Sequence, residues 1–361
     1  MYIKKKCLVF YTYLPPWRVD IFNAMGEMFD LTTIFLHINA DGFKYNTEAL
    51  LSRLNSRFII WNMGFLFNNV LFRFGMGYLI FKYKPEVVYT HEYSPTSILL
   101  SCYRKLGIFN FRLIITTSDN EIILTSHSKI KRLFRKFVLR NSDGLVVYSE
   151  NVRELYQKLD SKLRIEVCPN IQNPESLLAS KSANRSSKQA LPKEFLLFVG
   201  RLEHVKGVDV LIEGFSALHD SQLNLVIVGK GSKRKEYENM VSHMGLTERV
   251  LFINGLYGTD LLNLYARAKF LILPSRWEPF GAVVNEALVF GCPVLLSRLA
   301  GSKVFIKEGF NGFLTDPMDQ EKFNSDLRKM IDHFAIRTNH NLMIESFEKR
   351  VKAFTNILDE N

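Results

Sequence analysis

Two glutamates lie eight residues apart in a stretch that also contains the bends that a ligand site needs. Glu278 and Glu286 fall within Ser275–Leu288, directly after the apolar run Phe270–Pro274. That run is predicted to be a buried strand, and the apolar segment after Gly281 is predicted to be a helix. Glycine would let a ligand approach the backbone where the helix begins, and unpaired N–H groups there suit phosphates and sugar hydroxyls. A surface loop with two solvated glutamates is the alternative.

Two cations follow an earlier apolar run in the same half of the chain. Arg201 and Lys206 stand in Gly200-Arg-Leu-Glu-His-Val-Lys-Gly207, directly after Phe195–Val199. A guanidinium can bind phosphate oxygens through two parallel hydrogen bonds, and an ammonium adds a point charge. Together the two side chains could neutralise much of a diphosphate. Two solvated surface cations are the alternative interpretation.

Two short turns follow the next apolar runs. Gly229-Lys-Gly231 comes after Leu223–Val228, and Asn254-Gly-Leu256 comes after Val250–Ile253. A single turn of this kind is not specific to any function. In open α/β sheets, however, ligands bind beyond the carboxyl ends of the strands. We therefore expect these turns, the two cations and the two glutamates to lie at one edge of a sheet.

The elements that must position these residues form an alternating pattern. Short runs that are apolar throughout indicate parallel strands covered on both faces, and the segments between them have a helical period. The predicted strands are Cys7–Thr12, Leu31–Leu36, Phe58–Trp61, Glu86–His91, Leu113–Thr117, Gly144–Ser149, Ile165–Cys168, Phe195–Val199, Leu223–Val228, Val250–Ile253, Phe270–Leu273 and Pro293–Leu296. The predicted helices are Trp17–Met28, Pro95–Leu106, Lys129–Arg140, Asn151–Leu159, and residues near 207–219, 233–244, 259–268, 282–290, 320–334 and 341–358. This is the βαβ pattern of doubly wound sheets.

Length and composition divide the pattern in two. A chain of 361 residues exceeds the size at which a single core usually stops growing. A polar, serine-rich stretch separates two alternating sets. We therefore predict an N-terminal Rossmann-like domain over residues 1–168, a linker over 169–193 and a C-terminal Rossmann-like domain over 194–335. A C-terminal helix over 336–361 would pack back on the first domain.

Charge and cysteine content narrow the choice of partner and compartment. The net charge of +11 favours an anionic partner, whether nucleic acid, anionic lipid or a phosphorylated substrate. The four cysteines are far apart, so we expect a reducing compartment and neither disulfides nor a zinc site. The basic start and its apolar run, which ends at Pro15-Pro16, are predicted to be a first strand and not a signal segment. No uncharged apolar run is long enough to span a bilayer, and we expect a cytoplasmic protein.

Taken in order, the motifs of the second half resemble those of the retaining GT-B glycosyltransferases of family 4. They are Gly-Arg-x₄-Lys-Gly, Val-Gly-x-Gly, Phe-x-x-Gly, Glu-x₇-Glu, Ala300-Gly301 and Gly309-x-x-Gly312-Phe-Leu. The resemblance is strong over 194–318 and looser over the first domain. It implies a GT-B fold, with two Rossmann-like doubly wound domains facing across a cleft. It also implies transfer, with retention, of a sugar from a nucleotide-diphosphate-sugar to a glycan or lipid-linked acceptor, in the biosynthesis of cell-surface polysaccharide or glycolipid.

The resemblance also implies roles for individual residues. Arg201 and Lys206 would hold the donor diphosphate, Glu286 would bind the ribose hydroxyls, and Glu278 would contact the donor sugar. The backbone at Phe280, Gly281 and Ala282 would contact the sugar and the phosphate. The base pocket would be lined by Gly229, Gly231, Asn254 and Leu256, and Gly200 would be a further donor-binding position. Because no Asp-x-Asp motif occurs, the cations would carry the diphosphate charge. We expect neither a metal nor a cofactor.

The first domain departs from the family pattern in its candidate residues. Many relatives have a Gly-Gly loop after the first strand, whereas this chain has Leu14-Pro-Pro-Trp-Arg18. Arg18 could hold phosphate or acceptor, and a structural turn anchored by Trp17 is the alternative. His91 ends the fourth apolar run, where relatives often have histidine too. It either faces the cleft or satisfies a strand end.

A second departure follows the fifth strand. Ser118 stands where many relatives have a histidine, and Asp119 and Glu121 come just after it. Asp119 is a catalytic candidate that could orient the acceptor or assist its deprotonation, and Glu121 is a candidate acceptor contact. Retaining enzymes of this group are thought to use the leaving phosphate as the base, which is the competing interpretation.

The positive charge is concentrated in one segment. Lys129–Arg140 contains six cations and no acid. On a helix its apolar residues fall on one stripe; they are Ile130, Leu133, Phe134, Phe137 and Val138. One interpretation is a helix lying on an anionic membrane, which would make the protein peripheral on the inner face, with Phe65–Tyr83 as a second contact. The other is a domain helix whose apolar stripe packs on the sheet.

Two further functions compete with the glycosyltransferase. A nucleotide-sugar epimerase of GT-B architecture would turn over the donor without an acceptor. A nucleic-acid-binding protein would use the basic face, but no recognisable reading module occurs and basic residues interleave with aromatic ones only over residues 129–140. The motif set favours the glycosyltransferase, and we expect no nucleic-acid partner.

Overall fold

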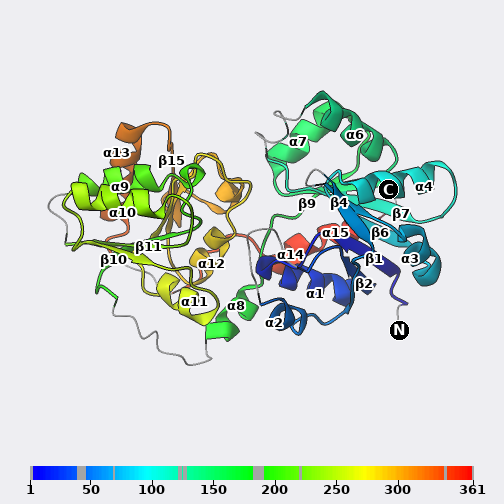
Figure 1. Cartoon of the computed structure of the whole chain (residues 1–361), viewed down its shortest axis with the longest axis horizontal. Coiled ribbons are helices and arrows are strands. Elements are labelled where there is room, and N and C mark those ends of the chain that lie inside the picture. Colours follow the sequence, from blue (N-terminus) through cyan, green and yellow to red (C-terminus); the bar gives the residue numbers. More distant parts are fainter. Residues whose placement is uncertain are drawn as a thin grey trace. The chain divides into compact units, whose positions relative to one another are not determined.

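The chain forms two compact units, each built on a parallel sheet (Figure 1). The computed structural model describes residues 3–38, 46–67, 70–120, 124, 128–181, 191–218, 222–336 and 340–359. The first unit comprises Met1–Ile171 and Phe347–Asn361, and the second comprises Gln172–Ser346.

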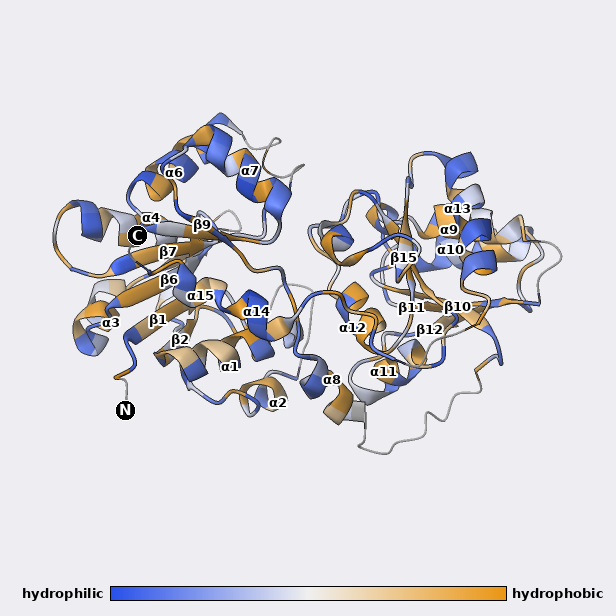
Figure 2. Ribbon diagram, turned by 180° about the vertical axis from the view of Figure 1, so that it is seen from behind, coloured by the Kyte–Doolittle hydropathy of each residue, from blue (hydrophilic) through white to orange (hydrophobic). Residues whose placement is uncertain are grey.

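The first unit contains a seven-stranded parallel sheet in the order β3-β2-β1-β6-β7-β8-β9. Its strands are β1 (Lys6–Tyr11), β2 (Asp30–Phe35), β3 (Arg57–Ile60), β6 (Val87–His91), β7 (Arg112–Thr116), β8 (Gly144–Val147) and β9 (Ile165–Val167). The inner strands are buried along nearly their whole length, as expected for runs that are apolar throughout. Figure 2 shows β1 and β6 as mostly hydrophobic, whereas α6 alternates between hydrophobic and hydrophilic residues. The predicted doubly wound, parallel architecture is confirmed.

Several helices of the first unit begin where the sequence supplies a cap. The helices of this unit are α1 (Val19–Met28), α2 (Thr47–Leu51), α3 (Met76–Tyr83), α4 (Pro95–Lys105), α6 (Lys129–Arg140) and α7 (Glu150–Leu159), with a 3₁₀ turn, η1, at Pro16–Arg18. Ser94, Ser128 and Ser149 each accept a backbone N–H from the residue three positions on. Each cap thus fixes where its helix starts, just beyond a strand or loop.

The C-terminal residues return to the first unit in two short helices. These are α14 (Phe347–Val351) and α15 (Ala353–Asn356). The Tyr89 hydroxyl on β6 donates a hydrogen bond to the carbonyl of Phe354. The helical period predicted from residue 341 is wrong for 341–346, which form no helix.

The helices α2 and α3 and one hairpin of the first unit were not predicted. An antiparallel hairpin of β4 (Gly64–Phe67) and β5 (Val70–Arg73) lies between β3 and α3. Phe65 and Phe72 face each other across it and stack with ring centroids 5.4 Å apart. Such a cross-strand aromatic pair stabilises a two-stranded ribbon.

The second unit contains a six-stranded parallel sheet in the order β12-β11-β10-β13-β14-β15. Its strands are β10 (Phe195–Val199), β11 (Asn224–Val228), β12 (Val250–Ile253), β13 (Leu271–Leu273), β14 (Val294–Ser297) and β15 (Gly312–Thr315). Its helices are α8 (Pro174–Lys181), α9 (Val208–Ser216), α10 (Arg234–His243), α11 (Thr259–Tyr265), α12 (Val283–Val289) and α13 (Gln320–His333), with 3₁₀ turns η2 (His204–Lys206) and η3 (Gly301–Phe305). Of the strands, only β15 was not predicted from the sequence.

The strand order of the second unit reverses between β10 and β13. Strands β10 to β12 extend to one side, and β13 to β15 extend to the other. Loops that leave such a switch point in opposite directions open a crevice at the carboxyl ends of the strands, where ligands bind in open α/β sheets. The loops after β10 and β13 carry the two cations and Glu278.

Candidate functional site

The loops after β10 and β13 touch through their backbones. The carbonyl of Val205 accepts hydrogen bonds from the N–H groups of Arg276 (2.9 Å) and Trp277 (3.2 Å). Gly207 has φ +66°, and a Cβ there would lie 2.0 Å from the carbonyl oxygen of Pro274. A side chain at this position would therefore be strained and would also collide with backbone.

Gly207→Ala is expected to lower the free energy of unfolding by at least about 3 kcal/mol. The left-handed conformation alone costs an L-residue about 1–2 kcal/mol, and the contact with Pro274 adds to that. Urea titration would measure the loss. Gly245→Ala is the matched control because Gly245 has φ +68° but nothing within 4 Å of the added Cβ. Equal losses at both positions would contradict the packing argument.

Lys206 and Glu278 form a buried ion pair between the two loops. Only 9% and 8% of these residues' surfaces are exposed, and the Lys206 ammonium donates a hydrogen bond to Glu278 Oε2. The carbonyl of Glu278 also accepts the N–H of Gly301 at 3.2 Å. An ammonium has three N–H donors. The structure thus brings together two of the predicted catalytic residues, and an anionic ligand could share the Lys206 charge with Glu278.

A second ion pair anchors the loop after β13. The Arg276 guanidinium donates two parallel hydrogen bonds to Asp209 on α9, at 2.7 and 2.8 Å, and a third to the carbonyl of His204 at 3.1 Å. Burial opposes ionisation of Asp209, but the hydrogen bonds from Arg276 hold its pKa below the usual value. The sequence analysis did not identify this pair, whose members lie in separate segments. It fixes the loop that carries Glu278.

The glycine turn after β11 packs on the loop that carries Arg201. A Cβ at Gly229 would lie 1.9 Å from the carbonyl oxygen of Gly200, and a Cβ at Gly231 would lie 2.2 Å from that of Leu202. Both glycines are therefore needed for a close approach of two backbones. The Arg201 side chain is exposed.

The same two loops are also joined by side-chain hydrogen bonds, and the turn after β12 makes a further side-chain contact. Glu203 accepts hydrogen bonds from the backbone N–H and the hydroxyl of Ser232, at 2.8 and 2.7 Å, and these bonds lower the pKa of Glu203. Asn254 accepts a hydrogen bond from Arg234 on α10 at 2.9 Å, whereas Leu256 is half-buried. The predicted base-pocket residues thus follow β11 and β12 at the carboxyl edge of the sheet.

The backbone around Gly281 is held by η3. The Phe280 carbonyl accepts the Ser302 N–H at 2.8 Å, and the Phe280 ring packs edge-on against Phe305 with centroids 5.6 Å apart. Gly281 has φ +94°, which favours glycine, and Ala282 is the N-cap of α12. The predicted helix therefore begins one residue later, at Val283.

Glu286 lies on α12 among different partners. Burial raises its pKa to about 7, and the neighbouring Tyr265 and Gln172 side chains act in the opposite direction. Gln172 also accepts a hydrogen bond from Asn285 at 3.2 Å. Sequence reasoning found Glu286 but not Tyr265 or Gln172, which come from α11 and from the segment before α8.

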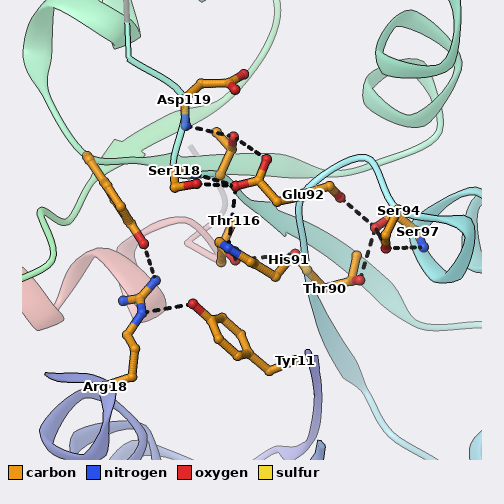
Figure 3. A network of polar contacts seen from close by, with 12 residues as sticks. Tyr11, Arg18, Thr90, His91, Glu92, Ser94, Ser97, Thr116, Ser118 and Asp119 are labelled. Atoms are coloured by element: carbon orange, nitrogen blue, oxygen red, sulfur yellow. Dashed lines mark hydrogen bonds and ion pairs between the residues drawn. The ribbon is translucent and has the colours of Figure 1, made fainter. Parts of the chain in front are cut away.

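In the first unit, two predicted residues meet at the carboxyl edge of the sheet (Figure 3). Arg18 is buried and donates hydrogen bonds to the hydroxyls of Tyr11 (3.3 Å) and Tyr148 (2.8 Å). The Tyr11 ring stacks on the His91 ring with centroids 4.5 Å apart. Arg18 and His91 therefore belong to one cluster, at the ends of β1 and β6.

Burial and the Arg18 charge lower the pKa of His91 to about 3, although a hydrogen bond with Thr116 opposes the shift. Its Nδ1 lies 3.0 Å from Thr116 Oγ1, and its Nε2 lies 3.4 Å from Glu92 Oε1. The imidazole is therefore neutral at neutral pH. Its contact with Glu92 is not an ion pair under those conditions.

Glu92 was not identified from the sequence. It has φ +59°, which is uncommon for a residue other than glycine and often marks a functional site. Its carboxylate accepts hydrogen bonds from the N–H and the hydroxyl of Ser118, at 2.7 and 2.5 Å, and from the Thr117 hydroxyl at 3.1 Å. Ser118, which replaces the expected histidine, thus ties the end of β7 to the end of β6 (Figure 3).

Asp119 continues this network. It is buried, accepts a hydrogen bond from the Tyr156 hydroxyl at 2.6 Å, and donates its N–H to Thr117 Oγ1 at 3.1 Å. The Tyr156 hydroxyl also lies 2.6 Å from the Tyr93 hydroxyl. The Asp119 carboxylate is thereby held in place. Glu121 lies outside the described residues.

Metal and membrane features can be assessed over the described part of the chain. There, no group of three or more His, Cys, Asp or Glu side chains is arranged to hold a metal ion. All four cysteines are free thiols, and burial raises the pKa of Cys7 and Cys168. Among the described helices none is both long and apolar enough to cross a bilayer.

The chain has two parallel, doubly wound sheets. The second unit also has glycine turns and a buried Lys206–Glu278 pair at the switch point of its sheet. The fold is that of the GT-B glycosyltransferases. Residues 180–349 match the family model of the glycosyl transferases group 1.

The chain is also similar to individual proteins, both in sequence and in structure. The uncharacterized glycosyltransferase MJ1178 of Methanocaldococcus jannaschii is 27% identical over 281 residues, which cover 73% of each chain. MJ1607 of the same organism is 32% identical over 146 residues, which cover 40% of this chain but only 37% of that protein. In structure, Anabaena Alr3699/HepE in complex with UDP-glucose superposes with a TM-score of 0.69 at 16% identity, covering 98% of each chain.

Proposed function

We propose that the protein is a retaining, metal-independent glycosyltransferase that moves a sugar from a nucleotide-diphosphate-sugar to a glycan or lipid-linked acceptor. Its pathway would be the synthesis of cell-surface polysaccharide or glycolipid, on the cytoplasmic side of a membrane. The buried Lys206–Glu278 pair at the switch point carries the proposal. The structural similarity to a protein solved with UDP-glucose supports this type of donor.

The donor half of the reaction needs positive charge where the leaving diphosphate develops negative charge. Lys206 supplies a fixed ammonium within a buried loop contact, where electrostatic interactions are stronger than in water. Arg201 follows the same strand and would bind a second phosphate oxygen. Glu278, held by Lys206 and Gly301, would accept a hydrogen bond from a sugar hydroxyl.

The nucleotide would bind along the same sheet edge. Glu286 in its carboxylate form would accept hydrogen bonds from both ribose hydroxyls. The backbone at the half-buried residues Gly281 and Ala282 would meet sugar and phosphate, and the turns after β11 and β12 would line the base pocket. None of these interactions uses a metal ion.

The acceptor half rests on the cluster in the first unit. His91 is neutral at physiological pH and would act as a hydrogen-bonding group and not as a cation. Asp119 already accepts a hydrogen bond from Tyr156, so we assign it to orientation of the acceptor. The leaving phosphate would then take the acceptor proton. Arg18 and Glu121 are the further acceptor-side candidates.

A panel of nucleotide-sugars tested by thermal unfolding would examine the proposal. A donor at 100 times its Kd should stabilise the protein by about 2.7 kcal/mol. Lys206→Ala should lose most of this stabilisation, whereas Lys235→Ala, at an exposed position on α10, should keep it. If no donor stabilises the protein, the proposal is wrong. An altered donor formed without any acceptor would instead indicate an epimerase.

A further inference from the structure

Three helices of the first unit carry positive charge without any acidic residue. Residues 76–84, 95–110 and 129–140 cover α3, α4 with the residues after it, and α6. Together these segments contain ten lysines and arginines and no aspartate or glutamate. Exposed cations occur in all three, among them Lys82, Lys105 and Lys131.

The three helices adjoin one another. A Cβ at Gly77 on α3 would lie 3.3 Å from the Tyr103 hydroxyl on α4 and 3.6 Å from the Phe109 ring just after α4. On the other side of α4, Lys105 and four α6 residues line a surface hollow of about 440 Å³, and the Lys105 ammonium lies 5.6 Å from the centre of the Phe137 ring. Figure 1 shows α4 between α3 and α6.

Apolar side chains are exposed on the same three helices. On α6, Ile130, Leu133 and Phe134 expose 65%, 67% and 46% of their surface. Leu106 and Ile108 are exposed next to Phe109, and Phe81 is exposed one helical turn after Gly77. We call these six residues and the cations around them the α3–α4–α6 face.

The packing of α6 bears on the two interpretations that its sequence left open. A domain helix normally buries its whole apolar stripe against the core. Val138 is buried and Phe137 is half-buried, but the other three stripe residues, toward the N-terminus of the helix, are exposed. Packing on the domain therefore accounts for only the C-terminal part of the stripe.

We propose that the α3–α4–α6 face docks on a bilayer surface rich in anionic lipid. Charge complementarity selects this occupant, because the exposed cations of three segments that contain no acidic residue attract an anionic surface, and the exposed apolar side chains can enter the acyl boundary. Lysine and arginine stems can lie along that boundary while their charged ends stay at the headgroups. A nucleic acid would satisfy the charge but not the apolar side chains.

Vesicle flotation with the full chain would test the proposal without any donor or acceptor. The probe is vesicles of phosphatidylcholine with 30% phosphatidylglycerol, compared with phosphatidylcholine alone. Lys131→Glu with Arg132→Glu should weaken binding to the anionic vesicles on the order of 30-fold, because each basic residue contributes about 1 kcal/mol near such a surface. Ile130→Ser with Leu133→Ser should weaken it at least about tenfold through lost apolar burial.

Matched controls keep the test specific. Lys235→Glu with Lys352→Glu makes the same change of charge at exposed positions away from this face, and Met318→Ser removes an exposed apolar side chain in the second unit. Both controls should bind anionic vesicles like the wild type. The proposal is overturned if the wild type does not float with anionic vesicles, if the controls weaken binding as much as the face variants, or if only the charge variant matters and a short RNA competes fully. Because the assay involves no sugar transfer, its outcome is independent of the proposed activity.

Discussion

Lys206→Ala is expected to lower kcat by about 10²–10³, the usual effect of removing one group that stabilises charge in a transition state. The ammonium is buried beside Glu278, so water cannot replace it at full strength. Steady-state turnover with the donor identified by thermal unfolding would measure the effect. Turnover close to that of the wild type would remove Lys206 from the mechanism.

Loss of fold must be separated from loss of catalysis in this variant. Removing Lys206 leaves the Glu278 carboxylate buried without its ion-pair partner, and breaking a buried pair in this way typically costs about 3–5 kcal/mol. The double variant Lys206→Ala with Glu278→Gln removes that unpaired charge. We expect it to regain much of the stability while kcat stays low. Recovery of kcat along with stability would show that Lys206 acts only through folding.

The fold was largely predictable because most strands are apolar throughout. Phe195–Val199 is a continuous apolar run, and the structure places it as a fully buried strand with the predicted bounds. The hairpin β4–β5 was not predicted, because only short polar interruptions separate its apolar residues from those of α3, and periodicity cannot assign such a run. The strand β15 was also not predicted, because it contains only four residues and begins with a glycine. Gly312 is required there because a Cβ would lie 2.1 Å from the Val294 carbonyl oxygen.

The site was predictable only where a short motif carries it. Lys206, Glu278 and Glu286 were candidates because they belong to short motifs that resemble those of a known family, and the structure pairs the first two. Arg276 and Asp209 were not found, because an ion pair between a loop and a helix that are far apart in the sequence depends on tertiary structure. Glu92 gave no signal because a positive φ is visible in a sequence only when glycine provides it.

The stability of the protein is expected to fall as the pH rises from 5 to 8, and Glu286 is the reason. Burial raises its folded-state pKa to about 7, above an ordinary value of 4.5. A carboxyl group whose pKa is raised by folding binds its proton more tightly in the folded state, so its contribution is full at low pH and is lost as the pH passes 7. The loss should be about 2–3 kcal/mol.

Glu286→Gln should abolish this component of the pH profile. The amide keeps the size of the side chain and can still form hydrogen bonds with Tyr265 and Gln172, but it carries no charge. Urea titrations at pH 5, 6, 7 and 8 would compare it with the wild type and with Glu248→Gln, at an exposed control position. Parallel profiles for the wild type and Glu286→Gln would contradict the assignment.

Donor binding should respond to pH in the opposite direction. Ribose hydroxyls donate to a carboxylate, so binding requires the ionised form of Glu286, of which about one tenth is present at pH 6 and nine tenths at pH 8 if the pKa is about 7. Calorimetry should therefore show a donor affinity roughly tenfold higher at pH 8 than at pH 6. The diphosphate diester of a nucleotide-sugar does not titrate in this range, so the change belongs to the protein. Glu286→Gln should bind weakly at both pH values, and an unchanged pH dependence in that variant would assign the effect to another group.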